Sequence, residues 1–232
     1  MQYHFLLAGL DDLQLGQKPK LPFPKLLELL EEQMSASDFA LLQLLRKHND
    51  DPDILALMED DAVRDRFNET SLSEEDFRTQ LLYEQGMKSK NRFVRSWFEF
   101  NLNLNNVLAA SVCKKHGYDP EKVIVGDNEV AQLLRKSGVS KNANLAAVMP
   151  DLKEIIAISE IENLLQREKH IDALRWQWLD DYTLFKYFET DNVLAYYLQA
   201  EILHRWDDLT REQGEQIFRS LLADMKKDIH FE

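Results

Sequence analysis

The sequence predicts an all-α protein made of several helical bundles, and three observations favour that fold class. Seven glycines and six prolines in 232 residues are under half of the roughly 12 % that a typical domain carries. Leucine occurs 37 times, against 25 for valine, isoleucine and threonine combined, and unbranched side chains favour helix over strand. Apolar residues also recur at spacings of three and four along most of the chain, which is the period of an amphipathic helix.

The N-terminal part predicts a short opening segment and then several helices. Residues 1–22 combine a brief apolar piece with a proline cluster, and leucines from position 26 onward begin a helical repeat. Ser37-Asp38 can cap a second helix. Asn49-Asp50-Asp51-Pro52 interrupts the pattern, and short helical turns resume as far as Phe67.

A long uninterrupted helix is predicted in the middle of the chain. Two overlapping patterns, Ser71-x-x-Glu74 and Ser73-x-x-Asp76, offer capping-box chemistry for the helix before it. From Ser89, the expected N-cap, to Gly117, the expected stop, no glycine or proline intervenes, so the helix should run roughly 40 Å at 1.5 Å per residue. Gly117-Tyr118-Asp119-Pro120 predicts a lobe boundary, with lobes of residues 1–117 and 118–232, unless the chain forms one continuous domain.

The C-terminal half predicts further helices. Only Lys122-Val123-Ile124-Val125 resembles a strand. The expected helices cover 128–136 and 151–166, one capped by Asp191-Asn192, and a last one from the capping box Thr210-x-x-Gln213. An aromatic-rich stretch expected to be buried contains Trp176, Trp178, Leu179, Phe185 and Phe188. Asn106-Val107-Leu108-Ala109 recurs as Asn192-Val193-Leu194-Ala195, either by chance or as a duplicated helical unit.

Charge and cysteine content limit the classes of partner. With 28 Lys+Arg against 41 Asp+Glu, the chain carries a formal charge of −13, which disfavours nucleic acid and anionic membrane as direct ligands. No apolar stretch approaches the roughly 20 residues of a membrane span. Cys113 is the single cysteine, so a disulfide and a cysteine zinc site are excluded, and a buried thiol is favoured over a nucleophile. We expect a cytoplasmic protein without direct membrane insertion.

The charges are unevenly distributed. Residues 50–76 hold eleven acids and two arginines, a net charge of −9, and an acid-free stretch follows with four cations. A solvated acidic loop beside a helix start is one interpretation, and a partner-binding dipole is the other. Cations at a helix N-terminus oppose the helix dipole, which suggests an external role. The candidate partner-interface residues are Lys88, Lys90, Arg92 and Arg95.

The sequence offers no catalytic or cofactor-binding motif. Seven scattered glycines form no phosphate-binding loop. Glu201-x-x-His204 has the spacing used in di-iron bundles, but such a site needs a second copy, and Glu168-Lys169-His170 has the wrong spacing. We therefore predict no catalytic residue, no cofactor, no metal and no enzymatic activity.

Two groups of side chains leave alternatives open. The aromatic residues near the C-terminal half could line a pocket, although packing between helices is favoured. Asparagine is a poor helix former, so a cluster of it within one helix requires an explanation. Inter-helix hydrogen bonds are the preferred one and a ligand site is the alternative. The cluster consists of Asn101, Asn103, Asn105 and Asn106.

Two stretches carry motifs of a known family. The first is Phe93-Val94-Arg95-Ser96-Trp97-Phe98-Glu99 with Asn105-Asn106-Val107-Leu108-Ala109-Ala110. The second is Tyr187-Phe188-Glu189, Val193-Leu194-Ala195-Tyr196, Ile202-Leu203-His204-Arg205-Trp206-Asp207-Asp208-Leu209 and Gly214-x-x-x-Phe218. In this order they resemble the C-type central-stalk family of V-type/A-type ATPases, to which the eukaryotic d-type stalk protein is related, and in particular a short bacterial branch. The opening Tyr3-His4-Phe5-Leu6-Leu7-Ala8-Gly9-Leu10 is similar to that branch as well.

This resemblance implies a non-catalytic component of the central stalk of a rotary motor. Proteins of this family form a funnel of helical bundles that couples the soluble rotor shaft to the membrane rotor ring. The implied partners are other V-type ATPase subunits, which would hold the protein at the membrane periphery. The alternative is a helical adaptor or regulator unrelated to the motor, and an enzyme or di-metal carboxylate protein is less favoured.

Overall fold

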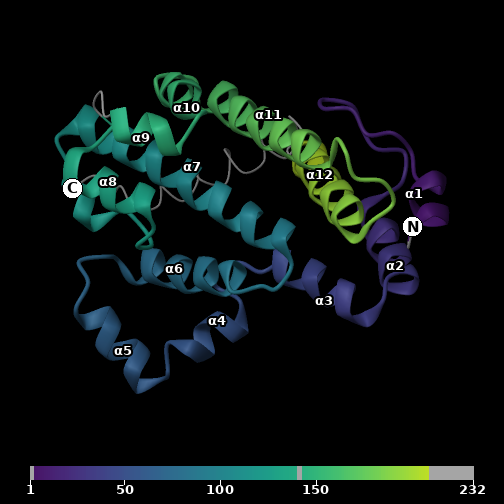
Figure 1. The fold of residues 1–232 in the computed structure, drawn as a ribbon, viewed down its shortest axis with the longest axis horizontal. Helices are drawn as coiled ribbons and strands as arrows, with labels where there is room; N and C mark the ends of the chain where they lie inside the picture. The colour runs from purple at the N-terminus through teal and green to yellow at the C-terminus, as the bar shows by residue number, and fades with distance from the viewer. Residues whose placement is uncertain (1–2, 140–142, 209–232) are drawn as a thin grey trace, which may run out of the picture. The chain divides into compact units, whose positions relative to one another are not determined.

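The computed structural model describes residues 3–139 and 143–208, and this part of the chain is all-α (Figure 1). It contains twelve α-helices and one 3₁₀ helix, with no strand among the described residues. The predicted fold class is therefore confirmed. None of the described helices is both long enough and apolar enough to cross a bilayer.

The chain divides into two compact units, Met1–Ser35 with Arg175–Glu232, and Ala36–Leu174. The described helices of the first unit are α1 (His4–Gly9), α2 (Phe23–Gln33), the end of α11 (Leu164–Thr183) and α12 (Thr190–Asp208). The second unit contains α3 (Ala36–Leu45), α4 (Pro52–Leu57), α5 (Asp61–Asn68), α6 (Glu74–Met87), α7 (Arg92–His116), η1 (Pro120–Lys122), α8 (Glu129–Ser137), α9 (Ala143–Val148), α10 (Leu152–Ser159) and the start of α11. The predicted lobe boundary at residue 117 does not coincide with this division, because α7, η1 and α8 contact one another within the second unit.

Helix α7 organises the second unit. Its 25 residues extend about 37 Å at 1.5 Å per residue, and it contacts α6, α8 and α10. The N-cap is Asn91, whose side chain accepts the Val94 N–H at 2.9 Å. The predicted cap, Ser89, lies two residues too early, since its hydroxyl accepts the N–H of Asn91 instead. Gly117 ends the helix in the left-handed conformation, with φ of 71°, as the sequence predicts.

Helices α6 and α7 lie side by side in Figure 1 and pack closely at one glycine. A Cβ atom on Gly86 would lie 2.1 Å from ring carbons of Phe98. The ring therefore occupies the space that any other residue at position 86 would fill. Gly86 and Phe98 are both buried, so this contact sets the spacing of the two helices.

In the first unit, α2 packs against α12. Phe23 at the start of α2 has its ring centroid 5.7 Å from that of Tyr197 and 4.6 Å from that of His204. Leu26 and Leu30 follow at helical spacing and are 2 % and 0 % exposed. The predicted apolar repeat that starts at Leu26 is thus confirmed as the buried face of α2.

In the second half of the chain, the strand-like segment forms no strand and one predicted helix is wrong. Residues 122–125 form no strand, because backbone groups of Val125 bond to the side chain of Asn106. The helix predicted over 151–166 is two helices, since α10 ends at Ser159 and Asn163 caps α11 by accepting the Gln166 N–H at 2.9 Å. The last predicted helix, from Thr210, lies outside the described residues.

Candidate functional site

The four predicted interface cations lie in the connection between α6 and α7, which holds Lys88 and Lys90, and in the first turn of α7, which holds Arg92 and Arg95. Lys88, Lys90 and Arg92 are exposed, and within residues 3–139 and 143–208 no carboxylate forms an ion pair with them. We call these three residues the basic corner. Arg95 differs, because it is only half-exposed and its guanidinium donates to the carbonyls of Ser89 and Lys90 at 2.6 and 2.9 Å. Arg95 thus stabilises the conformation of the connection. The three cations of the basic corner are the ones that a partner protein could contact.

Some of the carboxylates of the acidic segment 50–76 cap helices. Asp51 accepts the Asp53 N–H at 3.1 Å and starts α4. Asp60 accepts the N–H groups of Ala62 and Val63 at 3.0 and 3.2 Å and starts α5. Carboxylates are favourable at helix N-termini. Some of the carboxylates in segment 50–76 therefore have a structural role. This favours the interpretation of a solvated acidic segment over that of a partner-binding dipole.

Asn106 joins α7 to the segment before α8. Its Oδ1 accepts the Val125 N–H at 2.9 Å, and its Nδ2 donates to the Val125 carbonyl at 2.8 Å. Asn106 is 2 % exposed, so neither backbone group of Val125 has water as an alternative partner. The Asn106 side chain thus takes the place of a neighbouring strand as the hydrogen-bond partner of this β-branched segment.

The remaining asparagines of α7 are also bonded within the protein. Asn105 donates to the hydroxyl of Tyr83 on α6 at 2.8 Å, and Asn103 accepts from Asn128, the N-cap of α8, at 2.8 Å. Asn101 donates to a carbonyl one turn earlier in its own helix at 2.9 Å. Three of the four therefore form inter-helix or helix-to-segment hydrogen bonds, which confirms the packing interpretation over a ligand site.

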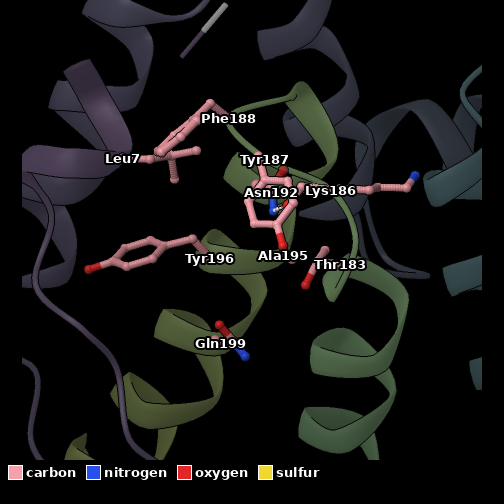
Figure 2. Close-up of a pocket in the computed structure, with 9 residues that line it drawn as sticks. All are labelled: Leu7, Thr183, Lys186, Tyr187, Phe188, Asn192, Ala195, Tyr196 and Gln199. Atoms are coloured by element: carbon pink, nitrogen blue, oxygen red, sulfur yellow. Dashed lines mark hydrogen bonds between the residues drawn. The ribbon is translucent and has the colours of Figure 1, made fainter. Parts of the chain in front are cut away.

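A hollow of about 240 Å³ lies in the first unit, where α11 meets α12 beside α1 (Figure 2). Leu7 from α1 and Phe188 form one wall, while Tyr196 and Gln199 project from α12. The ammonium of Lys186 points away from the other labelled side chains in Figure 2; it lies 4.4 Å from the centroid of the Tyr182 ring. The walls of the hollow are thus mainly apolar and aromatic.

The loop over this hollow has a strained residue and a clamp. Phe188 has φ of 59°, a left-handed conformation that is costly for a residue with a bulky side chain. Its carbonyl accepts the Tyr3 N–H at 3.1 Å. Asn192 clamps the loop from α12, because its Oδ1 accepts the Glu189 N–H at 3.2 Å and its Nδ2 donates to the Lys186 carbonyl at 3.1 Å. Asp191-Asn192 is predicted to precede the helix, but α12 begins at Thr190, so both residues lie in its first turn, from which Asn192 accepts the N–H of Glu189, the residue before the helix.

Asn192 and Asn106 open the two copies of the predicted internal repeat. Each uses its amide to bind a backbone N–H and a backbone carbonyl. Asn106 does so in the middle of α7, whereas Asn192 does so in the first turn of α12. The duplicated unit stays a prediction.

The aromatic stretch around the hollow is only partly buried. Trp176 is 8 % and Leu179 is 0 % exposed, as predicted. The prediction is wrong for Phe185, which is 85 % exposed, and Tyr187 is 67 % exposed. Both lie in the connection between α11 and α12, where none of the helices in residues 3–139 and 143–208 covers their rings. Their spacing in the sequence does not reveal this exposure.

Negative charge surrounds Tyr196 in the hollow. Burial, and then the charges of Asp11 and Asp12, raise the pKa of its hydroxyl to about 12. Burial is also the main reason why the pKa of Asp180 is raised, although a hydrogen bond from Gln199 at 2.7 Å opposes the shift. The hollow therefore favours neutral or cationic groups over anions.

The titration of Tyr196 provides a test of this environment. An unfolded tyrosine ionises near a pKa of about 10, so the unfolded state loses the proton first as the pH rises, and the free energy of unfolding falls between about pH 10 and 12. Ultraviolet titration of wild-type and Tyr196→Phe chains isolates this phenol. The double change Asp11→Asn and Asp12→Asn should lower the pKa of Tyr196 but leave it above 10, because burial is the larger cause. An unchanged pKa would contradict the charge contribution.

The residues of the metal hypothesis have other contacts. Glu201 accepts a hydrogen bond from the Tyr197 hydroxyl at 2.7 Å, and His204 stacks on Phe23 with an interplanar angle of 17°. Across the described residues, no three His, Cys, Asp or Glu side chains gather as a metal site would require. The Glu-x-x-His spacing thus belongs to the packing of α12.

Cys113 lies on the buried side of α7. It is 4 % exposed, which confirms the predicted buried position. Burial, and to a smaller extent the charge of Asp119, raises the pKa of its thiol. Because the thiolate is the reactive form, this environment disfavours a nucleophilic role.

The fold and these surfaces define an all-α protein that presents a basic corner and an aromatic hollow. The chain belongs to the family described as "Protein of unknown function (DUF2764)", whose model matches residues 63–229, well over half of the sequence. The matched range includes the asparagines of α7, the basic corner and the connection between α11 and α12. No curated protein and no solved structure matches the chain significantly.

Proposed function

We propose that this protein is a non-catalytic central-stalk component, of the C type, of a V-type/A-type rotary ATPase. In this role it couples the soluble rotor shaft to the membrane rotor ring and stays on the cytoplasmic side, held at the membrane by partner subunits. The resemblance carried by the segments 93–110 and 187–218 supports this assignment.

The continuity of α7 is the observation that best supports the proposed role. The first resembling segment lies within one 25-residue helix, and its asparagines tie that helix to α6, to α8 and to Val125. A coupling element has to resist bending and twisting. Side chains that bond a helix to three different segments restrict both motions, because each bond fixes the rotation of α7 about its axis.

The basic corner supplies a surface for binding another protein of the motor. Three exposed cations within five residues, Lys88, Lys90 and Arg92, are unusual in a chain with a formal charge of −13. They would attract an acidic loop of a partner, and such attraction raises the rate and the specificity of association.

Charge reversal at the basic corner tests the proposed assembly. A chain with Lys88→Glu, Lys90→Glu and Arg92→Glu is expected to lose most of its co-purification with the rotor-shaft and ring proteins expressed beside it, because attraction becomes repulsion. The measurement is the amount of each motor protein retained on the tagged chain at low and moderate salt.

A matched control carries the same change in net charge elsewhere. Three exposed lysines of the second unit serve this purpose: Lys122, Lys136 and Lys153. Their triple change to glutamate should leave co-purification intact. Equal loss in both variants would remove the basic corner from the interface. If the wild-type chain retained neither shaft nor ring proteins, the motor assignment itself would fail and the adaptor alternative would be favoured.

A further inference from the structure

An exposed apolar surface lies on the connection between α11 and α12. Leu184, Phe185 and Tyr187 are 60 %, 85 % and 67 % exposed, and we call these three residues the aromatic ridge. Single exposed apolar residues are ordinary on a protein surface, but a contiguous group suggests a binding site. The ridge lies next to the hollow of Figure 2, since Tyr187 also lines that hollow.

The ridge is held by hydrogen bonds on both sides. Asn192 bonds to backbone groups of residues 186 and 189, and the Lys186 N–H donates to the Thr183 carbonyl at 2.9 Å. The Phe188 carbonyl is bonded to the Tyr3 N–H. A surface that is ordered before binding loses less conformational entropy when a partner binds. The exposure of Phe185 and Tyr187 is thus a feature of a defined loop.

The hollow beside the ridge suits a single side chain. Its volume of about 240 Å³ is below the roughly 300–1,000 Å³ of sites for small molecules. Two of its polar lining side chains are already bonded within the protein: Thr183 to the Leu179 carbonyl at 2.7 Å and Gln199 to Asp180 at 2.7 Å. The wall that Leu7 and Phe188 form beside them is apolar and favours an apolar side chain.

The charges near the ridge are almost all negative. Segments 11–12 and 180–191 contain six carboxylates and one ammonium. That ammonium, Lys186, is paired with Asp191. Asp181 and Glu189 are exposed and flank the ridge in the sequence. Burial is the main cause of the raised pKa of Tyr196 in the hollow, and the charges of Asp11 and Asp12 add to it. An apolar surface with acidic flanks is complementary to a partner that combines apolar and basic side chains.

We infer that the aromatic ridge and its hollow bind a basic amphipathic helix of a partner protein. One large apolar side chain of that helix fills the hollow, a second packs on Phe185 and Tyr187, and its Lys or Arg residues face Asp181 and Glu189. Helices bind such surfaces through apolar residues at i, i+3, i+4 and i+7. This inference does not depend on the rotary-motor assignment, because it is argued from exposed side chains, the hollow and the surrounding charges, and not from the resemblance.

A synthetic peptide tests the inference on the full chain. The probe is a fluorescent helical peptide with leucine at i, i+3, i+4 and i+7 and with lysine or arginine elsewhere. Two comparison peptides replace the cations by glutamate or the leucines by glutamine. We expect the basic amphipathic peptide to bind with a Kd of about 10 μM, to bind more weakly at high salt, and to exceed both comparison peptides at least tenfold.

Variants of the chain locate the binding site. Phe185→Ser with Tyr187→Ser should weaken binding at least tenfold, as should Asp181→Asn with Glu189→Gln at low salt. The matched control is Leu164→Ser with Leu165→Ser, which removes two residues that are 61 % and 53 % exposed on α11. Far-ultraviolet circular dichroism checks that each variant remains folded, and the control should bind like the wild type.

Three results would overturn the inference. The first is equal binding of the acidic and basic peptides, and the second is unchanged binding by the Phe185→Ser, Tyr187→Ser chain. The third is self-association of the wild-type chain in sedimentation that this double change abolishes, since the occupant would then be a second copy. Tight peptide binding that is lost only in the ridge and acidic variants supports it.

Discussion

Replacing Asn106 with leucine is expected to destabilise the protein by about 2–5 kcal/mol, because two buried backbone groups of Val125 lose their partner and each unsatisfied group costs about 1–3 kcal/mol. Leucine keeps the branching of asparagine but has no hydrogen-bonding group, and its two methyl groups are larger than the amide atoms, so the loss combines the missing hydrogen bonds with some overpacking. Against a total stability of about 5–15 kcal/mol, such a change is large. Urea unfolding followed by circular dichroism measures it.

The neighbouring residue is the control. Asn105 is exposed and donates a hydrogen bond to the hydroxyl of Tyr83, so Asn105→Leu should cost at most about 1.5 kcal/mol. Similar losses at the two positions would contradict the role assigned to the Asn106 bridge.

The charge variant Asn106→Asp adds a dependence on pH. A protonated carboxyl can accept the Val125 N–H and donate to its carbonyl, whereas a buried carboxylate cannot donate. The folded state therefore raises the pKa of the introduced carboxyl above its unfolded value. Stability relative to wild type should be highest below about pH 4, the unfolded pKa, and should fall as the pH rises from there through the raised folded pKa, above which the difference is constant. A pH-independent difference would contradict this reasoning.

Replacing Gly86 with alanine is expected to destabilise the protein by about 2 kcal/mol, although alanine is the better helix former. The gain in helix propensity is about 1 kcal/mol. The new Cβ would lie 2.1 Å from the Phe98 ring, and overpacking of a buried contact costs typically about 1–3 kcal/mol and occasionally more. The steric term should therefore dominate, which thermal or urea unfolding can measure.

Two further variants isolate the steric contribution. At Gly9 in α1 a Cβ would meet nothing within 4 Å, so Gly9→Ala should be neutral or slightly stabilising. In a Phe98→Leu background, Gly86→Ala should cost less than it does in the wild type, because the ring that it meets is absent. Equal costs in both backgrounds would show that the clash with Phe98 is not the cause.

Local signals in the sequence predict the helices well where one residue decides the outcome. Ser73 caps α6 by accepting the Asp76 N–H at 3.1 Å, and Asn128 caps α8 by accepting the Ala131 N–H at 3.0 Å. Gly117 stops α7. Each of these depends on residues only a few positions apart, so the order of residues along the chain contains the information.

The candidate site is harder to predict. The basic corner is visible as a run of cations, but the bonding of Arg95 to the carbonyls of residues 89 and 90 is not. The hollow involves Leu7 and Tyr196, which lie far apart in the chain. A loop between α11 and α12 with three aromatic residues and no glycine or proline is a signal that could have indicated the exposed ridge.

The amino-acid order by itself determined the helical class, several helix ends such as those at Ser73, Asn128 and Gly117, and the excess of negative charge, because these depend on composition and on contacts within one or two turns. Only the tertiary structure decided that residues 122–125 follow an asparagine side chain instead of forming a strand. It also decided that Phe185 faces solvent while Trp176 does not. Burial and long-range hydrogen bonds depend on which segments of the chain contact one another. The apolar period of a single helix does not specify those contacts.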